Sequence, residues 1–391
     1  MRPVLALTAT RLFDGFRMLE RHAVLVEGDR VRAVVPAGDI PAGARRRDLG
    51  GGLLAPGFID LQVNGGGGVL FNDDPTPGTI RAIGRAHRRF GTTGFLPTLI
   101  TDVPDTLPAA VAAARAVMAE PPDDAARVLG VHLEGPFLNV ARRGVHAAEH
   151  IRAMTEDDIA LLCRLAGGPG RILVTLAPEC VPPGAIRRLT GAGLIVAAGH
   201  TAATYDEIQA ALAEGLAGFT HLFNAMSPFG SREPGTVGAA LAAPEAWCGI
   251  IADGHHVHPA ALRVAVAAKS RGLVLLVTDA MPPVGAADPS FRLYGQTITA
   301  TGGRCTTADG TLAGSALDMA GAVRNAVDLL GLPVEHALRM ASAYPASALF
   351  PEPRFGRLVP GRLADLVLLD DDLRAIETWV GGVESGGGSR A

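Results

Sequence analysis

Two histidines, His200 and His221, each follow a short apolar run of the chain. The segment between them, residues 204–214, has apolar residues at helical spacing and begins with a capping-box pattern, so the unit is predicted to be strand, helix, strand. In an α/β barrel, the side chains that do chemistry follow the carboxyl ends of successive parallel strands. One histidine at a strand end is more often structural, but two in consecutive units are candidate ligands for a single metal ion.

Two carboxylates follow other apolar runs in the same way. Glu134 ends the run at 128–134, and Asp279 follows the run at 274–278. A carboxylate and two imidazoles leave a fourth coordination position open for water, as in catalytic zinc-type sites. A bound metal lowers the pKa of water to about 7. We therefore expect Glu134, His200 and His221 to hold the metal and Asp279 to exchange protons with the water.

The elements that must position these residues are apolar runs that alternate with helical patterns. The predicted strands are residues 57–63, 94–98, 128–134, 172–177, 194–199, 218–221, 248–252 and 274–278. The predicted helices are residues 80–90, 107–119, 155–165, 185–190, 204–214 and 260–269. Eight successive β/α units predict an α/β fold of the TIM (β/α)8 barrel type. An inserted hairpin is expected at 291–311, with helices after it at 317–330 and 334–341.

Short strand patterns return only at the two ends of the chain. The simplest arrangement pairs both ends in a second, small β-sandwich domain outside the barrel. The predicted domains are residues 1–53 (first part of the β domain), 54–350 (the barrel) and 351–391 (second part of the β domain). The last segment ends in a glycine- and serine-rich tail that we expect to be flexible.

Composition narrows the class of protein. The chain has 391 residues, of which 48% are hydrophobic and 19% charged, with a net charge of −4. This balance gives no strong field that would favour nucleic acid or membrane as a partner. The four cysteines show no paired spacing, and neither a secretory segment nor an apolar run of membrane-spanning length is visible. We expect a cytoplasmic protein.

Longer motifs around these residues resemble a known family. PGFID at 56–60 and GRLVPGRLAD at 356–365 are similar to the amidohydrolase superfamily. Six further motifs resemble the N-acetylglucosamine-6-phosphate deacetylase family: HLEGPF at 132–137, AGHT at 198–201, HLFNAM at 221–226, REPG at 232–235, IIADG at 250–254 and VTDA at 277–280. Together these motifs span nearly the whole chain in order.

The resemblance implies a role for each matching residue. Glu134, His200 and His221 match ligands of one divalent transition metal per subunit, with Zn²⁺ or Fe²⁺ suiting the ligand set about equally. Asp279 matches the catalytic acid and base, and His146 matches a histidine that contacts the substrate and polarises its acetyl carbonyl. The residues that match groups holding the sugar phosphate are Asn224, Ala225, Arg232 and His256. The resemblance places Arg232 in the neighbouring active site of a homodimer.

Gln62 and Asn64 depart from the wider superfamily pattern. Many relatives carry His-x-His at these positions and use the pair to bind a second metal. Neutral amides are poor ligands for a transition metal. We therefore interpret Gln62 and Asn64 as vestigial second-metal positions in an enzyme with one metal.

The expected reaction is hydrolysis of N-acetyl-D-glucosamine 6-phosphate to D-glucosamine 6-phosphate and acetate by metal-activated water, in amino-sugar catabolism and cell-wall recycling. N-acetylgalactosamine 6-phosphate is an alternative substrate, because the choice of epimer depends on loop geometry around one hydroxyl. Another amide hydrolase of the superfamily, such as a dihydroorotase-like protein, would need the strand-one His-x-His and a bridging lysine. A catalytically inactive barrel acting as a scaffold would have no reason to keep all three ligands and Asp279.

Overall fold

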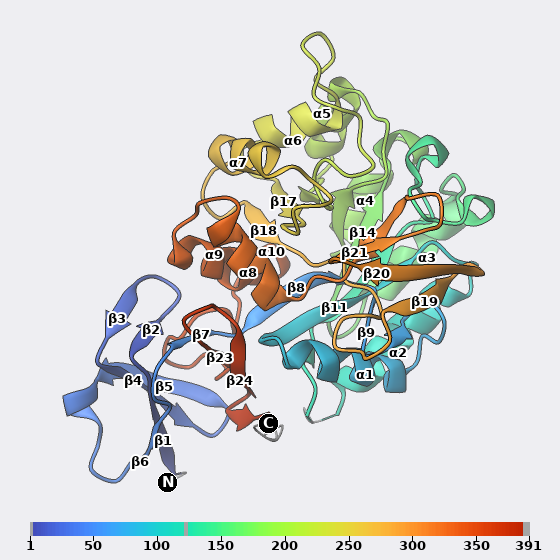
Figure 1. Ribbon diagram of the computed structural model, residues 1–391. Coiled ribbons are helices and arrows are strands. Elements are labelled where there is room, and N and C mark those ends of the chain that lie inside the picture. The colour runs from blue at the N-terminus through green and yellow to red at the C-terminus, as the bar shows by residue number, and fades with distance from the viewer. Residues whose placement is uncertain (1–2, 121–123, 386–391) are drawn as a thin grey trace.

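The computed structural model describes residues 3–120 and 124–385. A large α/β barrel lies beside a small β domain that contains both ends of the chain (Figure 1). The predicted fold class is therefore confirmed. The predicted domain limits, 1–53, 54–350 and 351–391, remain a prediction. From residue 386 on, the tail predicted to be flexible lies outside the described residues.

Eight parallel strands form the barrel, and they follow one another around it in chain order. They are β8 (Phe58–Val63), β11 (Thr92–Ile100), β13 (Gly130–Glu134), β14 (Arg171–Leu176), β15 (Ile195–Ala198), β16 (Gly218–Phe219), β17 (Trp247–Ile250) and β18 (Val274–Leu276). A short strand, β12 (Arg127–Val128), pairs with the start of β11. Nearly every strand residue is buried, as expected for a parallel sheet covered on both faces. Each strand coincides with an apolar run predicted from the sequence.

The first and last barrel strands meet through a short set of contacts near the mouth of the barrel. Val63 and Ala280 form an isolated parallel bridge there, and the Asp279 backbone N–H donates to the Gln62 carbonyl oxygen at 3.0 Å. Below the bridge, the buried Asp60 carboxylate accepts hydrogen bonds from the backbone N–H and the hydroxyl of Thr278. Burial raises the pKa of Asp60 to about 7. These contacts close the seam between β8 and β18 next to Asp279.

Helices cover the outside of the barrel (Figure 1). They are α1 (Pro77–Arg88), α2 (Thr106–Met118), α3 (Glu156–Ala166), α4 (Ala185–Gly191), α5 (Tyr205–Ala213), α6 (Gly235–Ala242), α7 (Pro259–Ala268), α8 (Met319–Asp328), α9 (Val334–Ala341) and α10 (Ala343–Leu349). The predicted capping box of α5 is present, with Thr204 and Glu207 bonded reciprocally. The sequence did not predict α6, because its residues are small or apolar on all sides and give no helical period.

Two sheets pack face to face in the small domain. The first contains β1 (Val4–Thr8), β4 (His22–Glu27), β5 (Arg30–Pro36) and β6 (Arg45–Asp48) in the order β5-β4-β1-β6. The second contains β2 (Arg11–Phe13), β3 (Met18–Glu20), β7 (Leu53–Pro56), β23 (Leu366–Leu369), β24 (Ala375–Val380) and β25 (Val383–Glu384) in the order β25-β24-β23-β7-β2-β3. Leu7, Leu54, Leu366 and Trp379 are buried together between the sheets. Pairing of β7 with β23 joins the two ends of the chain.

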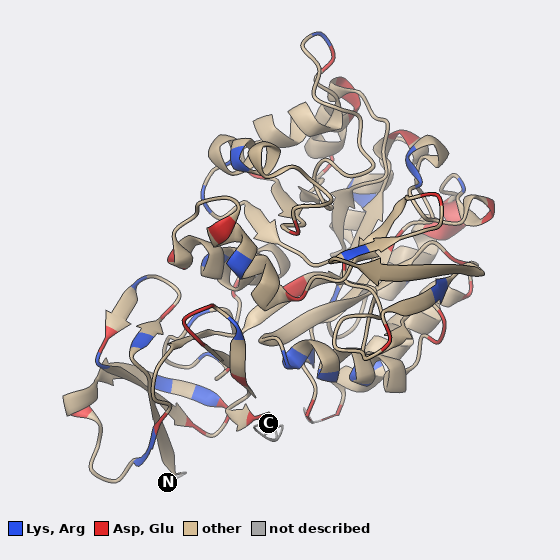
Figure 2. Cartoon of the chain, in the orientation of Figure 1, with Lys and Arg blue, Asp and Glu red and all other residues tan. Residues whose placement is uncertain are grey.

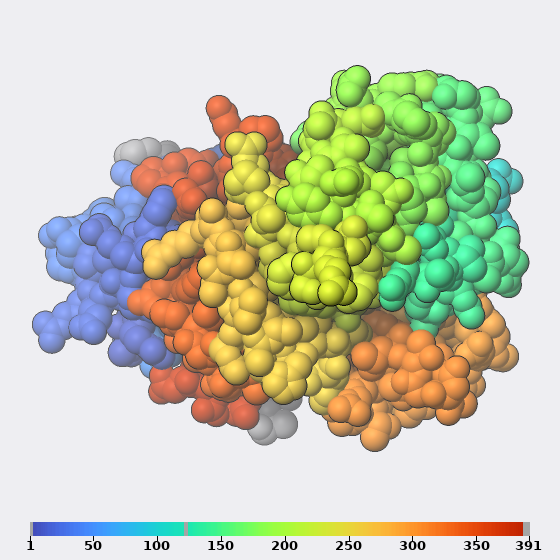
Figure 3. All heavy atoms as spheres, turned by 90° about the horizontal axis from the view of Figure 1, so that it is seen from above, coloured from blue at the N-terminus to red at the C-terminus, as the bar shows by residue number. Residues whose placement is uncertain are grey.

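A four-stranded antiparallel sheet is inserted after β18. It consists of β19 (Ser290–Leu293), β20 (Gln296–Thr301), β21 (Arg304–Thr306) and β22 (Leu312–Ser315), so the inserted hairpin expected at 291–311 is part of a larger meander. Its apolar side packs on Ile100, the last residue of β11, and on Met281, which lies in the loop after β18. A small hairpin, β9 (Gly65–Gly66) with β10 (Val69–Leu70), follows β8. In Figure 3 the inserted sheet, in orange, borders the loops at the mouth of the barrel.

Basic and acidic residues are interspersed along the chain (Figure 2). This distribution agrees with the small net charge of −4. Within residues 3–120 and 124–385, no helix combines the length and apolar character needed to span a membrane.

Candidate active site

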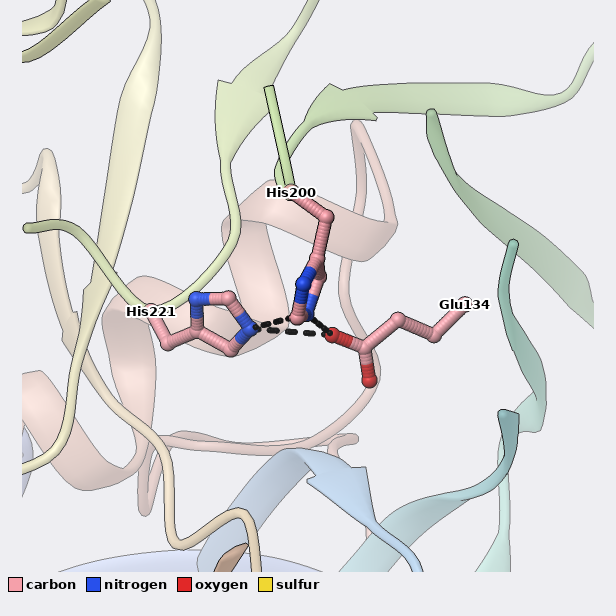
Figure 4. A group of neighbouring side chains, drawn as sticks. All are labelled: Glu134, His200 and His221. Carbon is pink, nitrogen blue, oxygen red and sulfur yellow. Dashed lines mark hydrogen bonds and ion pairs between the residues drawn. The ribbon is translucent and has the colours of Figure 1, made fainter. Parts of the chain in front are cut away.

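The side chains of Glu134, His200 and His221 converge at the mouth of the barrel (Figure 4). They come from the ends of β13, β15 and β16, and all three are buried. The Glu134 Oε1 atom lies 3.1 Å from His200 Nε2 and 2.9 Å from His221 Nε2, while the two Nε2 atoms lie 3.1 Å apart. One carboxylate oxygen and two ring nitrogens therefore face a common point, as the sequence predicted.

The hydrogen bonds around this cluster suit a metal ion. His200 Nδ1 lies 2.8 Å from the Arg142 carbonyl oxygen, which can only accept, so Nδ1 carries the proton and Nε2 presents a lone pair. Bonds of this kind commonly orient histidine ligands of metals. The other carboxylate oxygen of Glu134 accepts a hydrogen bond of 3.0 Å from the Gln62 amide. A cation between the three facing atoms would satisfy the lone pairs directed at each other.

The electrostatics of the cluster agree with an anionic carboxylate. Burial alone would raise the pKa of Glu134, but the facing rings of His200 and His221 outweigh burial and hold the pKa well below its ordinary value. For His221, burial lowers the pKa, and the bond and charge of Glu134 reverse that effect and raise it. The buried site thus favours positive charge beside Glu134, which a divalent metal would supply.

The backbone is strained at three of these strand ends. His200, His221 and Asp279 have φ angles of 50°, 30° and 53°, in the left-handed region that non-glycine residues rarely adopt. Such strain costs on the order of 1–3 kcal/mol per residue and clusters at functional sites. The turn that each residue makes at the end of its strand directs its side chain into the mouth of the barrel.

Asp279 lies across the site from the three converging side chains and accepts hydrogen bonds from two amides. Asn64 Nδ2 donates to Asp279 Oδ1 at 2.6 Å, and Gln62 Nε2 donates to the same oxygen at 3.1 Å. Burial and the nearby Glu134 charge raise the pKa of Asp279 to about 6, although the Asn64 hydrogen bond lowers it. A carboxyl group that titrates near neutral pH is suited to take up and return a proton.

Gln62 and Asn64 have contacts that the sequence did not reveal. The Gln62 amide bridges the two carboxylates, because it donates to Glu134 as well as to Asp279. Both residues therefore hold the acidic groups in place. This role is separate from their interpretation as vestigial second-metal positions. In the sequence, the pair of neutral amides at the end of a strand indicated a special role. Their hydrogen-bond partners could not be predicted, because those partners lie on other strands of the barrel.

His146 is buried beside the cluster. Its ring lies 4.3 Å from that of His200, measured between centroids, and its Nδ1 lies 2.8 Å from the Thr101 hydroxyl oxygen. Burial and the neighbouring His200 lower the pKa of His146 well below its ordinary value. A neutral imidazole next to the site can donate one hydrogen bond to a substrate oxygen.

A cavity of about 220 Å³ opens over these residues. Its lining includes all of the predicted site residues except Gln62 and Arg232: Asn64, Glu134, His146, His200, His221, Asn224, Ala225, His256 and Asp279. Ile100, Val145, Met281 and Leu312 contribute apolar surface to the same cavity. The fold thus gathers residues from positions 64 to 314 into one small pocket.

His256 is held by an acidic neighbour that sequence reasoning missed. Asp253 Oδ2 lies 2.6 Å from His256 Nδ1, and Asp253 Oδ1 accepts the backbone N–H groups of His255 and His256. Burial would raise the pKa of Asp253, but its bonds with His256 lower it. The carboxylate therefore fixes Nδ1 as a donor and leaves Nε2 for the cavity. An aspartate three positions before a histidine was the available signal.

Arg232 lies away from the cavity of its own chain. It is exposed on the loop before α6, which projects from the body of the molecule at the top of Figure 1. Phe229 on the same loop is 66% exposed. The Glu233 carboxylate fixes the base of the loop by accepting the backbone N–H groups of Tyr205 and Gly235. In the described parts of the chain, no carboxylate forms an ion pair with Arg232.

Comparison with protein families gives two matches that together span the chain. Residues 53–386 match the model of the amidohydrolase family. Residues 4–54 match a model described as the NagA composite domain. The first match contains the cavity, and the second covers most of the first part of the small β domain.

Individual relatives are similar over most of their length. An N-acetylgalactosamine-6-phosphate deacetylase of Shewanella sp. (strain ANA-3) is 44% identical, with 85% of this chain and 83% of the relative covered. An N-acetylglucosamine-6-phosphate deacetylase of Haemophilus influenzae is 36% identical, with 95% and 96% covered. The crystal structure of N-acetylglucosamine-6-phosphate deacetylase from Pasteurella multocida is 36% identical and superimposes with a TM-score of 0.93, with 98% of this chain and 100% of that chain covered.

Proposed function

This chain belongs to the amidohydrolase family, and we propose that it removes acetate from N-acetyl-D-glucosamine 6-phosphate to give D-glucosamine 6-phosphate. The observation that carries the proposal is the convergence of Glu134, His200 and His221 in the same pocket as Asp279. Relatives similar over nearly their full length, named as deacetylases of this sugar phosphate, support the choice of substrate.

The proposed cofactor is one divalent transition metal per subunit, Zn²⁺ or Fe²⁺, held by Glu134, His200 and His221. When bound, such a metal acts as a Lewis acid on the acetyl carbonyl and makes water a stronger acid. Gln62 and Asn64 support a count of one, because their amide nitrogens donate to carboxylates and neutral amides are poor ligands for these metals.

The protein's own groups manage the protons of the reaction. Asp279 takes a proton as water attacks the acetyl carbon, and it returns that proton to the nitrogen as the C–N bond breaks. The returned proton matters because an amine leaves poorly as an anion. His146 donates a hydrogen bond to the carbonyl oxygen as negative charge develops there. The acetic acid formed gives its proton to the amine, so the products are acetate and the ammonium form of the amine, and atoms and charges balance.

The rest of the pocket is proposed to hold the sugar phosphate. Asn224, Ala225 and His256 line the pocket beside the acidic cluster. The fourth phosphate-binding group, Arg232, is proposed to come from the neighbouring subunit of a homodimer. Its exposure on a projecting loop, outside the cavity of its own chain, supports this assignment. We also propose a cytoplasmic location, because a phosphorylated sugar does not cross membranes freely. We propose that the protein binds neither nucleic acid nor a membrane.

N-acetylgalactosamine 6-phosphate is the second candidate substrate. The 44% identical Shewanella relative carries the name of that activity, which gives the second candidate specific support. The two sugars differ only in the configuration at one hydroxyl. Measuring kcat/KM for both 6-phosphates on the same metal-loaded enzyme decides between them.

The test of the function is release of acetate from each sugar phosphate by the purified, metal-loaded protein. We expect turnover with the wild type. With Asp279→Asn, which keeps the shape of the side chain but cannot take the proton, we expect a loss of kcat of at least ~10²-fold. Metal content measured on both proteins is the control. If the wild type carries its metal and releases acetate from neither sugar phosphate, the proposed function is wrong.

A further inference from the structure

Thr101 is the residue that the mechanism above leaves unused although it touches His146. It directly follows β11 and is buried. Two groups of Thr101 approach the same ring nitrogen: the hydroxyl oxygen lies 2.8 Å from His146 Nδ1, and the backbone N–H donates to Nδ1 at 3.4 Å. Nδ1 of His146 is thus directed at Thr101, and Nε2 is the ring nitrogen that remains for the cavity.

These contacts decide which ring nitrogen carries the proton. A backbone N–H can only donate, so it needs a lone pair on Nδ1. In the opposite tautomer the Thr101 hydroxyl would donate to the Glu134 carbonyl oxygen, 3.5 Å away, and would accept a proton from Nδ1. That arrangement would place two N–H groups against each other. The backbone N–H of Thr101 therefore favours an Nδ1 without a proton, and the hydroxyl can then donate to the same lone pair at 2.8 Å.

The inserted sheet holds Thr101 in this position. The Tyr294 hydroxyl donates a hydrogen bond to the Thr101 carbonyl oxygen. Tyr294 lies in the turn between β19 and β20, where its φ of 47° is in the left-handed region. A left-handed backbone conformation at a non-glycine residue lowers the stability of the fold. The hydrogen bond from Tyr294 to Thr101 gives a reason for that conformation.

We propose that Thr101, held by Tyr294, is a positioning residue that fixes His146 with its proton on Nε2. The Nε2–H group then points at the cavity as a hydrogen-bond donor before substrate arrives. This inference rests on the proposed function, in which His146 donates to the carbonyl oxygen. It extends that function by assigning one step of preorganisation to a threonine and to a tyrosine 193 positions away in the chain.

The first test reads the tautomer without any reaction. In zinc-loaded protein with ¹⁵N-labelled histidine, the chemical shifts of the two ring nitrogens show which one carries the proton. The His146 signals are assigned by their loss in His146→Gln. We expect the proton on Nε2 in the wild type and a mixture of tautomers in Thr101→Val, which keeps the shape but lacks the hydroxyl. A proton on Nδ1 in the wild type would overturn the inference.

The second test is kinetic. A wrong histidine tautomer costs a hydrolase up to ~10⁴-fold in kcat. Because the backbone N–H of Thr101 remains, we expect Thr101→Val to lower kcat by roughly tenfold to a hundredfold with KM within about twofold. Thr101→Ser, which keeps the hydroxyl, should recover most of kcat, and Tyr294→Phe should give a smaller loss. In a His146→Gln background, Thr101→Val should have no further effect.

A matched control is the first residue of the strand that Thr101 follows. Thr92 in β11 is fully buried, and among the described residues its hydroxyl has no hydrogen-bond partner. Thr92→Val should leave both kcat and the His146 tautomer unchanged. An equal loss in Thr92→Val, or a further loss from Thr101→Val without His146, would mean that Thr101 supports the strand and not the tautomer. The two proposals also fail separately, because absent turnover in the wild type contradicts the function while the tautomer is still measured.

Discussion

Asn64 and Asp279 lie at the ends of the first and last barrel strands and share a hydrogen bond of 2.6 Å between Nδ2 and Oδ1. The donor favours the charged form of the carboxylate, so it lowers the pKa of Asp279 against the effect of burial. In the proposed mechanism, Asp279 must be ionised to act as a base. Its pKa therefore sets the acid side of the pH dependence of kcat/KM.

Asn64→Ala should move that acid limb to higher pH. Loss of the donor raises the pKa of Asp279. The carboxylate is then protonated at a higher pH, and activity is lost at a higher pH than in the wild type. We expect a shift of about one pH unit, because one hydrogen bond to a charged group is worth roughly 1.5 kcal/mol. The measurement is kcat/KM from pH 5 to 9 with metal content as the control. An unchanged limb with full metal occupancy would show that another group controls it.

Metal content should depend on the three converging side chains and on no second site. Elemental analysis of gently purified protein should find close to one transition metal per chain. His200→Ala and His221→Ala should each lose most of it, since each removes one of three protein ligands. His22→Ala in the small domain is the control and should keep the metal. A reproducible content near two per wild-type chain, with activity following the second equivalent, would contradict the single-metal proposal.

Arg232→Ala should weaken use of the phosphorylated substrate specifically. Charged hydrogen bonds contribute about 1.5–3 kcal/mol each, so kcat/KM for the 6-phosphate should fall by roughly tenfold to a hundredfold or more. Turnover of unphosphorylated N-acetylglucosamine should barely change. Arg187→Ala, an exposed arginine on α4, is the matched control and should behave as the wild type.

A mixed-dimer experiment tests where Arg232 acts. Chains with Arg232→Ala and chains with Asp279→Asn are each impaired on the 6-phosphate in the proposed scheme, for different reasons. If the arginine serves the neighbouring subunit, a mixed dimer contains one intact site and regains activity. No recovery in verified mixed dimers would place Arg232 in the site of its own chain.

Stability should fall in mild acid partly because of His87. This histidine is fully buried beneath the β9 hairpin, with Nε2 2.9 Å from the Gly65 carbonyl oxygen, and burial lowers its pKa to about 4. The unfolded chain, with a histidine pKa near 6.5, binds the proton more readily between pH 6.5 and 4. The folded state therefore loses stability as pH falls through that range.

The size of this effect follows from linkage. From pH 7 to pH 5, His87 should cost the wild type about 2 kcal/mol of unfolding free energy. His87→Gln keeps a side-chain donor near Gly65 but does not titrate, so its stability should depend less on pH by about that amount. Urea unfolding of both proteins at the two pH values measures the difference. Parallel pH profiles would mean that His87 keeps its ordinary pKa in the fold.

The sequence was sufficient where a local pattern carries the information. Each barrel strand is an apolar run, and Glu134 and His221 stand at or just beyond the end of theirs, so strand order alone predicted a shared site. The sequence did not predict a helix where apolar and polar side chains do not alternate with a helical period, as in α6. It also failed for contacts between distant positions, because nothing near Thr101 indicates that Tyr294 will bond to it.

The seam between β8 and β18 has a consequence for how activity appears during folding. The proposed metal ligands lie on strands that pair side by side along the continuous part of the sheet, from β13 to β16. Asp279 follows β18 at one end of this sheet, and the bridge from Val63 to Ala280 that completes the ring brings it to its amide partners Gln62 and Asn64 on the β8 side. A chain with every other strand paired but an open ring would capture its metal while Asp279 lacks the hydrogen bonds of Gln62 and Asn64, so hydrolysis should be slow until the ring closes. In refolding followed by both signals, metal uptake should precede the return of turnover, and the delay between them would measure the time that ring closure takes.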